Sequence, residues 1–178
     1  YPVSVQAAFD ATNLYVRLTF KAPTGGFDKS DKENEVKATI MFPNDKVPLG
    51  DQAGCWAACH QDAKGMPNGK DKTKYGSAGG MDLMQWKSSG KSVDGFVADK
   101  RNMEGGKAGA TAEGAKAGDT YTVTFTRKLA GNAVLAPGKA VPFGIAIHAD
   151  NAGGRFHHVS FGHTIGLGAD GDVKAAKQ

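Results

Sequence analysis

The sequence lacks the residue patterns that mark several common classes of protein. It has no apolar run near the roughly 18 residues that a membrane-spanning helix needs. No G-x-S-x-G, H-E-x-x-H or P-loop motif occurs, and the carboxylates do not cluster at a catalytic spacing. Aromatic residues do not alternate regularly with basic ones, and no nucleic-acid-binding motif is present. These absences argue against a membrane span in this chain, against enzymes of these classes, and against nucleic acid as a partner.

The N-terminal stretch YPVSVQ contains neither a basic region nor an apolar core, so no signal peptide is visible. Because the chain begins with Tyr, we expect it to be processed or excised from a larger protein, and export is therefore not excluded. The net charge is +4, and lysines are concentrated at 64–74 and 87–101. A solvated surface would account for these lysines, and the alternative is a basic rim that steers an acidic partner.

The chain is long enough for one domain, and its pattern is that of short strands joined by glycine-rich loops. In residues 13–20, large apolar residues alternate with polar ones, which is typical of a half-buried strand. No amphipathic helix is convincing. We therefore predict a single all-β domain over 1–178, an antiparallel β-sandwich with little helix. About eight strands are expected, at residues 2–9, 13–20, 35–42, 81–87, 93–100, 120–129, 141–150 and 154–164.

Two stretches do not fit strands. Residues 102–118 are rich in Gly and Ala, and we expect a flexible loop there. Residues 44–80 form a second expected loop, and loops of that length in a compact domain are usually functional or disordered. This second loop contains GCWAACH at 54–60, which holds both cysteines of the chain. We therefore interpret 44–80 as a site-bearing loop.

Three kinds of site could explain GCWAACH. A disulfide between Cys55 and Cys59 would close a very short loop, would constrain little, and would leave His60 unexplained. A zinc site is a second alternative, but the adjacent Cys59 and His60 cannot easily both reach one metal. The third is covalently attached haem c, whose usual motif is C-x-x-C-H. Here one residue is added, giving C-x-x-x-C-H, in which two thiols bind the haem and His60 binds the iron. We favour haem.

Haem iron bound by His60 needs a second axial ligand or keeps an open site. The remaining candidates are His148, His157, His158, His163 and Met66. In RFHHVSF, strand alternation places His157 on the same face as Val159, whereas His158 faces the other way. One of the two is therefore expected to point toward the interior of the sandwich or its mouth.

Longer stretches of the sequence resemble a known family. GCWAACHQDAKGMP, MDLMQWKSSG and IAIHADNAGGRFHHVSF are similar to the haem-binding domain of the γ subunits of ethylbenzene and dimethylsulfide dehydrogenases. VQAAFDATNLYVRLTF and ATIMFP resemble the first strands of that family. The resemblance covers about residues 3–168, and it implies a β-sandwich that holds one haem at the end of, or between, its sheets for electron transfer.

The resemblance also implies roles for individual residues. In the γ subunits the haem is b-type and is bound by a methionine and a lysine, whereas this chain has the cysteine motif of a c-type branch. The match places His60 in the position of the methionine and His157 in that of the lysine, with His158 as the alternative distal ligand. Trp86 and Met66 match family-like positions and are expected as haem-packing residues. For Trp86, plain burial in the core is an equal alternative.

These observations predict a monohaem c-type cytochrome domain that transfers single electrons and is not itself an enzyme. Its partner is expected to be another redox protein, such as a membrane cytochrome b or an oxidoreductase. Covalent haem attachment implies a periplasmic or extracytoplasmic location, with tethering to the membrane through a further segment as a variant. Two rivals remain: a haem-based sensor of small ligands, and a non-haem β-sandwich binding module with a Cys55–Cys59 disulfide.

Overall fold

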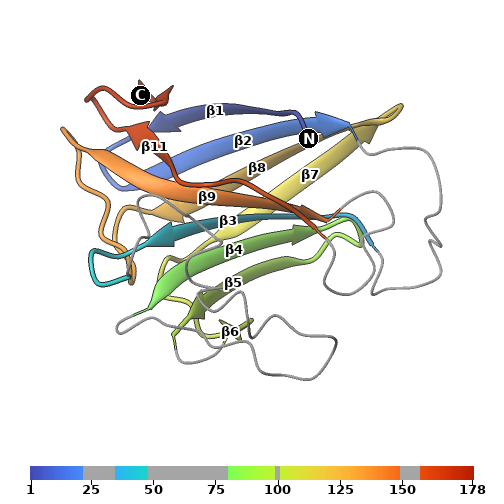
Figure 1. Cartoon of the computed structure of the whole chain (residues 1–178), viewed down its shortest axis with the longest axis horizontal. Coiled ribbons are helices and arrows are strands. Elements are labelled where there is room, and N and C mark those ends of the chain that lie inside the picture. The colour runs from blue at the N-terminus through green and yellow to red at the C-terminus, as the bar shows by residue number, and fades with distance from the viewer. Residues whose placement is uncertain (22–34, 48–79, 99–100, 149–156) are drawn as a thin grey trace.

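The computed structural model describes residues 1–21, 35–47, 80–98, 101–148 and 157–178. The regular secondary structure of these residues consists of strands alone, which pack as two sheets, and the predicted all-β fold is confirmed (Figure 1). Within the described ranges no helix is long and apolar enough to cross a membrane. The strands are β1 (Val3–Phe9), β2 (Asn13–Lys21), β3 (Lys37–Pro43), β4 (Met81–Lys87), β5 (Ser92–Val97), β6 (Arg101–Asn102), β7 (Thr111–Ala117), β8 (Thr120–Lys128), β9 (Ala140–His148), β10 (His158–Val159), β11 (His163–Gly166), β12 (Val173–Lys174) and β13 (Ala176–Lys177).

The smaller sheet has five strands in the order β13-β1-β2-β8-β7. Its four long strands are antiparallel, and β13 adds a short parallel pair to β1 at one edge. The predicted hairpin of residues 2–9 and 13–20 is present as β1 and β2. Its turn is fixed by Asp10, whose Oδ1 accepts hydrogen bonds from the backbone N–H groups of Thr12 and Asn13, each at 2.7 Å. These bonds lower the pKa of the Asp10 carboxyl group.

The larger sheet has eight strands, with β12-β11-β9-β3-β4-β5-β6 in order and β10 paired to β9. The predicted hairpin of residues 81–87 and 93–100 is present as β4 and β5. Residues 154–156 of the strand expected at 154–164 lie outside the described residues, and the rest contributes to two short strands, β10 and β11, which both pair with β9. The structure has more strands than the expected eight. Four of them, β6, β10, β12 and β13, have only two residues each, which is too short to give a pattern in the sequence.

One expectation about the loops is wrong. Residues 111–117, expected within a flexible loop at 102–118, form the edge strand β7. Their Gly/Ala-rich composition gives no strand signal, but β8 pairs with them along the whole of β7, from Thr111 opposite Thr126 to Ala117 opposite Thr120. Backbone hydrogen bonds to a strongly alternating neighbour therefore override the weak local propensity.

The main core lies between the two sheets and is filled by the alternating apolar rows of their inner faces. The alternating apolar residues of β2, which were expected on one face of residues 13–20, are buried here. The inward-facing residues of β3, β8 and β9 are buried with them. The larger sheet also carries a second hydrophobic cluster on the opposite side, which we call its outer face. The second cluster consists of Met41, Val47, Met81, Leu83, Val97 and Ala146, with Val93, Met103 and Val159 packed against it.

Glycine at position 114 is required by the packing of the two sheets. A Cβ at Gly114 of β7 would overlap the indole ring of Trp86, which projects from β4 into the main core. We expect Gly114→Ala to reduce the free energy of unfolding by about 1–3 kcal/mol, the usual cost of overpacking. Urea denaturation measures this loss, and Ala115→Ser at the exposed neighbouring position is expected to cost less than about 0.5 kcal/mol. Equal stability of the two variants would contradict this packing.

Candidate haem-binding face

Four predicted site residues, Cys55, Cys59, His60 and Met66, lie outside the described residues. What the structure does describe is the two residues on either side of 48–79 that belong to its core. Val47, just after β3, and Met81, at the start of β4, both belong to the second cluster on the outer face. The segment that carries GCWAACH therefore starts and ends at this cluster.

The outer face is buried along the centre of the larger sheet. Met41 and Leu83 lie on neighbouring strands, and each is 2% exposed. One step further along the same strands, the buried Gln85 donates a hydrogen bond from Nε2 to Oγ1 of Thr39 at 3.0 Å. Beside Thr39 on β9 lies Ala146, another member of the second cluster. This part of the face is thus an apolar, methionine-containing surface on which the polar side chains of Gln85 and Thr39 are paired with each other.

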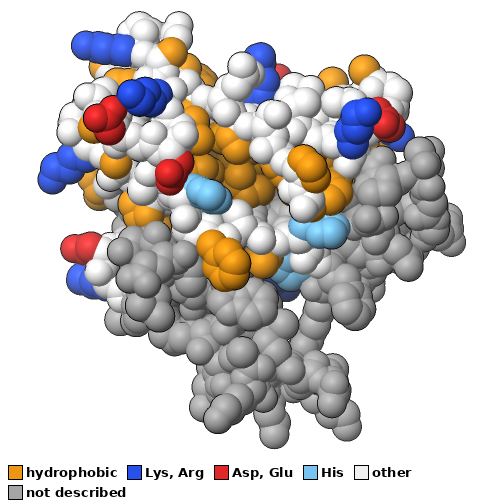
Figure 2. Space-filling model, turned by 45° about the horizontal axis from the view of Figure 1, so that its top comes forward, with side chains coloured by type: hydrophobic (Ala, Val, Ile, Leu, Met, Phe, Trp, Pro, Cys, Tyr) orange, Lys and Arg blue, Asp and Glu red, His pale blue; other side chains and the backbone are white. Residues whose placement is uncertain are grey.

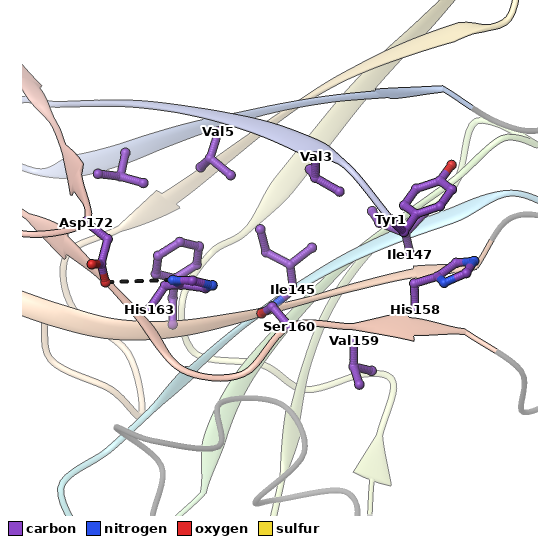
Figure 3. A pocket seen from close by; sticks show the side chains of 12 residues that line it. Tyr1, Val3, Val5, Ile145, Ile147, His158, Val159, Ser160, His163 and Asp172 are labelled. Atoms are coloured by element: carbon purple, nitrogen blue, oxygen red, sulfur yellow. Dashed lines mark hydrogen bonds and ion pairs between the residues drawn. The ribbon is translucent and has the colours of Figure 1, made fainter.

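Strand alternation predicts that the neighbouring histidines 157 and 158 face opposite ways, and β10 fixes the faces of His158 and Val159. β10 pairs with β9 so that His158 lies opposite Ile147 and Val159 opposite Ala146. Opposed residues of an antiparallel pair share a face, and Ile147 belongs to the main core whereas Ala146 belongs to the second cluster. Figure 3 shows His158 and Val159 directed to opposite sides of β10.

His157, the residue before β10, lies against His148, the last residue of β9. Their rings are stacked, with centroids 4.7 Å apart and planes inclined by 23°. Burial is the largest cause that lowers the pKa of His148 to about 3, and the nearby His157, Lys37 and Arg101 lower it further. His148 is therefore a neutral imidazole at neutral pH. The stacked pair stands at the His148 end of β9, on the face that carries the second cluster.

His158 instead lines a cavity of about 620 Å³ between β1 and the strands β9 to β11 (Figure 3). Its ring stacks on Tyr1, with centroids 4.3 Å apart. His163 stands further along the same cavity, with Nδ1 3.8 Å from Oδ2 of Asp172. The apolar lining comes mainly from Val3, Val5, Phe143, Ile145, Ile147 and Val173. Figure 2 shows hydrophobic side chains in a hollow on this face of the molecule, with histidines at its rim.

Trp86, which sequence analysis offered as a haem-packing residue, lies in the main core. It is 5% exposed, and its ring meets Tyr121 edge to face, with centroids 6.0 Å apart. Its side chain is therefore on the opposite side of β4 from Met81 and Leu83 of the second cluster. This position agrees with the core alternative that was left open for Trp86.

His148 is a residue of this region to which sequence analysis gave no role beyond that of one candidate ligand. Alternation in IAIHAD does predict its face, because His148 shares a side of the strand with Ala146 and lies opposite to Ile147. Its contact with His157 depends on the β9–β10 register, which is non-local. Among the residues that the structure describes, no group of three or more His, Cys, Asp or Glu side chains is placed to hold a metal ion.

Comparison with known proteins identifies a class of redox proteins. The model of the ethylbenzene dehydrogenase family matches residues 1–119. The chain belongs to this family, and the resemblance seen in its sequence is confirmed.

Two relatives extend the comparison over the whole chain. The chain is 49% identical to cytochrome c-552 of Stutzerimonas stutzeri over 187 residues, which cover 98% of this chain and 64% of that protein. It is 50% identical to cytochrome c-551 of Rhodocyclus tenuis over 180 residues, which cover 100% of this chain and 70% of that protein. The chain thus spans about two thirds of the length of these relatives.

Proposed function

We propose that the chain is a c-type cytochrome domain that carries single electrons on one covalently attached haem. The family and the two relatives, which are both named as cytochromes c, support this function and the predicted cofactor. They also favour an electron carrier over an enzyme and over a non-haem binding module. Haem supplies an iron that is reduced and reoxidised by one electron. Cys55 and Cys59 would hold it through thioether bonds, with His60 on one side of the iron.

The finer proposal is that His157 is the second axial ligand and that the haem is held at the outer face of the larger sheet. One observation supports it: the ring of His157 stacks on that of His148, which by alternation along β9 shares the face of Ala146 in the second cluster, and the residues that flank 48–79 belong to the same cluster. The residues of this face fit a haem. They offer apolar and methionine side chains for the macrocycle and imidazoles for the iron.

The reach of the chain is compatible with this arrangement. A strand of seven residues such as β3 is about 20–23 Å long. His60 lies 13 positions after Val47, a span of up to about 43 Å when extended. The motif can therefore face the His148 end of the sheet although its loop is held at the Met81 end.

A spectroscopic comparison of His157→Ala with His158→Ala tests the choice of ligand. We expect His157→Ala to give a high-spin ferric spectrum and rapid carbon monoxide binding after reduction, because one coordination position is vacated. His158→Ala is expected to remain low-spin, because its ring faces the cavity. The opposite result, with only His158→Ala high-spin, would contradict the proposal and move the haem to the inter-sheet cavity.

The wild-type domain is the control for the sensor alternative. With two protein ligands on the iron, it is expected to resist carbon monoxide under conditions where His157→Ala binds it. Prompt binding by the wild type would favour a haem-based ligand sensor.

The proposed electron-transfer function also implies a redox partner protein and a cellular location for the domain. The family description suggests a redox partner within an oxidoreductase system, and the lysines of 64–74 are a candidate docking rim for an acidic surface. Thioether attachment supports a periplasmic or otherwise extracytoplasmic location.

A further inference from the structure

His148 and His157 form a contact that neither the axial-ligand proposal nor the packing of the sheet requires. His148 closes β9 opposite Lys37 of β3, and its half-buried ring lies nearly parallel to the ring of His157 at 4.7 Å between centroids. Two adjacent, parallel imidazoles on one face cannot both bind one iron opposite His60. If His157 is the ligand, then His148 has another role.

The surroundings of His148 argue against simple space filling. Its Nδ1 atom is buried and has no hydrogen-bond partner among the described residues. Leaving a buried polar nitrogen unsatisfied costs on the order of 1–3 kcal/mol, so the ring is kept against His157 at a cost in stability, although stacking itself needs only a flat ring. An unsatisfied buried group in a native structure calls for an explanation, and a functional role is one of the recognised ones.

We propose that His148 is a positioning residue that stacks on His157 and fixes the plane of its imidazole ring. This inference rests on the proposed function, because it takes His157 as the distal ligand. A flat ring of the same size at 4.7 Å limits the rotation of His157 about its side-chain torsions. Residues that orient a metal ligand through hydrogen bonds commonly change metal affinity or activity by about 10–100-fold when they are replaced, and we expect an effect of that order from a ring that orients the ligand by stacking.

The test compares His148→Ala and His148→Phe, both carrying haem. Ferric electron paramagnetic resonance reports the relative orientation of the two axial rings. The rate of carbon monoxide binding to the reduced protein reports how firmly the distal ligand is held. We expect His148→Ala to remain low-spin, with shifted or broadened resonance and carbon monoxide binding at least about 10-fold faster than in the wild type. His148→Phe keeps a flat ring against His157 and is expected to resemble the wild type in both measurements.

The control variants separate this inference from the proposed function. His158→Ala, on the opposite face of β10, is expected to leave the resonance unchanged. If His157→Ala stays low-spin, the proposed distal ligand is wrong. If His157→Ala becomes high-spin while His148→Ala matches the wild type in resonance and in carbon monoxide rate, only the positioning role is overturned. A high-spin His148→Ala that carbon monoxide binds as readily as His157→Ala would also overturn it, because His148 would then be needed for ligation itself.

Discussion

Replacement of both Cys55 and Cys59 by serine is expected to give a protein from which acid–acetone extracts all of the haem. The two thiols of GCWAACH are the only cysteines in the chain, so no other thioether can form. Each single variant keeps one thiol and is expected to retain its haem covalently, with a pyridine haemochrome band between the c-type and b-type positions. Covalently bound haem is therefore expected to remain in both single variants and to be lost completely in the double variant.

Met66→Leu is a matched control in the same loop. It leaves the attachment motif intact, and it is expected to keep covalent haem and a low-spin spectrum because two histidines supply the axial ligands. Haem that stays on the double serine variant through extraction would contradict attachment at Cys55 and Cys59. A high-spin Met66→Leu would contradict bis-histidine ligation.

The second large effect is expected at a buried ion pair that ties the two sheets together. Asp82 of β4 and Arg127 of β8 are both fully buried, with Oδ2 and Nη2 3.1 Å apart. Asp82 also accepts hydrogen bonds from the backbone N–H groups of Asn132 and Ala133, at 3.0 and 2.9 Å. The guanidinium donates to the carbonyl groups of Lys128 and Ala133, each at 2.8 Å. Burial lowers the pKa of Arg127, and the charge of Asp82 opposes this shift, so Arg127 stays charged.

Removing either partner would leave the other charge buried and unpaired. We expect Asp82→Ala or Arg127→Met each to reduce the free energy of unfolding by about 3–5 kcal/mol, which corresponds to a fall in Tm of roughly 10 °C for a chain of this size. The double variant Asp82→Leu/Arg127→Met should cost less than the sum of the single changes, because no unpaired charge remains. Thermal and urea unfolding measure these effects.

Lys174→Met provides the control for the ion pair. Lys174 lies 2.9 Å from Asp170, but both side chains are largely exposed, at 76% and 95%. Its removal is expected to cost no more than about 1 kcal/mol. Single Asp82 and Arg127 variants that were as stable as this control would contradict the structural role of the pair. Because the pair lies between the sheets, variants that still fold should keep the wild-type haem spectrum.

Local alternation in the sequence predicts the strands wherever it is strong. The alternating rows in NLYVRLTF and TYTVTFTRKL correspond to β2 and β8 almost residue for residue, and MDLMQWK, also predicted as a strand, forms β4. The small residues of TAEGAKA carry no such signal, and β7 forms there because β8 provides a pairing edge. The sequence analysis did not predict the buried ion pair of Asp82 and Arg127, although alternation places both residues on inward faces. Arg127 continues the inward row of Phe125, and Asp82 shares its face with Met84.

The candidate site could be predicted in part. Alternation in RFHHVSF predicts that His157 and His158 face opposite ways; the register pairs His158 with Ile147 and Val159 with Ala146, and the stacking of His157 on His148 agrees with the prediction. It cannot show which of the two faces carries the second cluster and which carries the cavity, because that depends on contacts far apart in sequence. The stacking of His148 on His157 depends on the same register. Cys55, Cys59 and His60 lie outside the described residues, so their roles rest on the sequence motif and on the relatives.

The most direct test of covalent haem binding uses the wild-type chain, produced with a c-type cytochrome maturation system. The protein is denatured, extracted with acid–acetone, and examined as the reduced pyridine haemochrome. The account predicts that the haem stays with the polypeptide and shows the c-type band. Haem that passes into the acetone would instead indicate a b-type domain like the γ subunits. A colourless protein would contradict the cytochrome assignment and return GCWAACH to a disulfide or a zinc site.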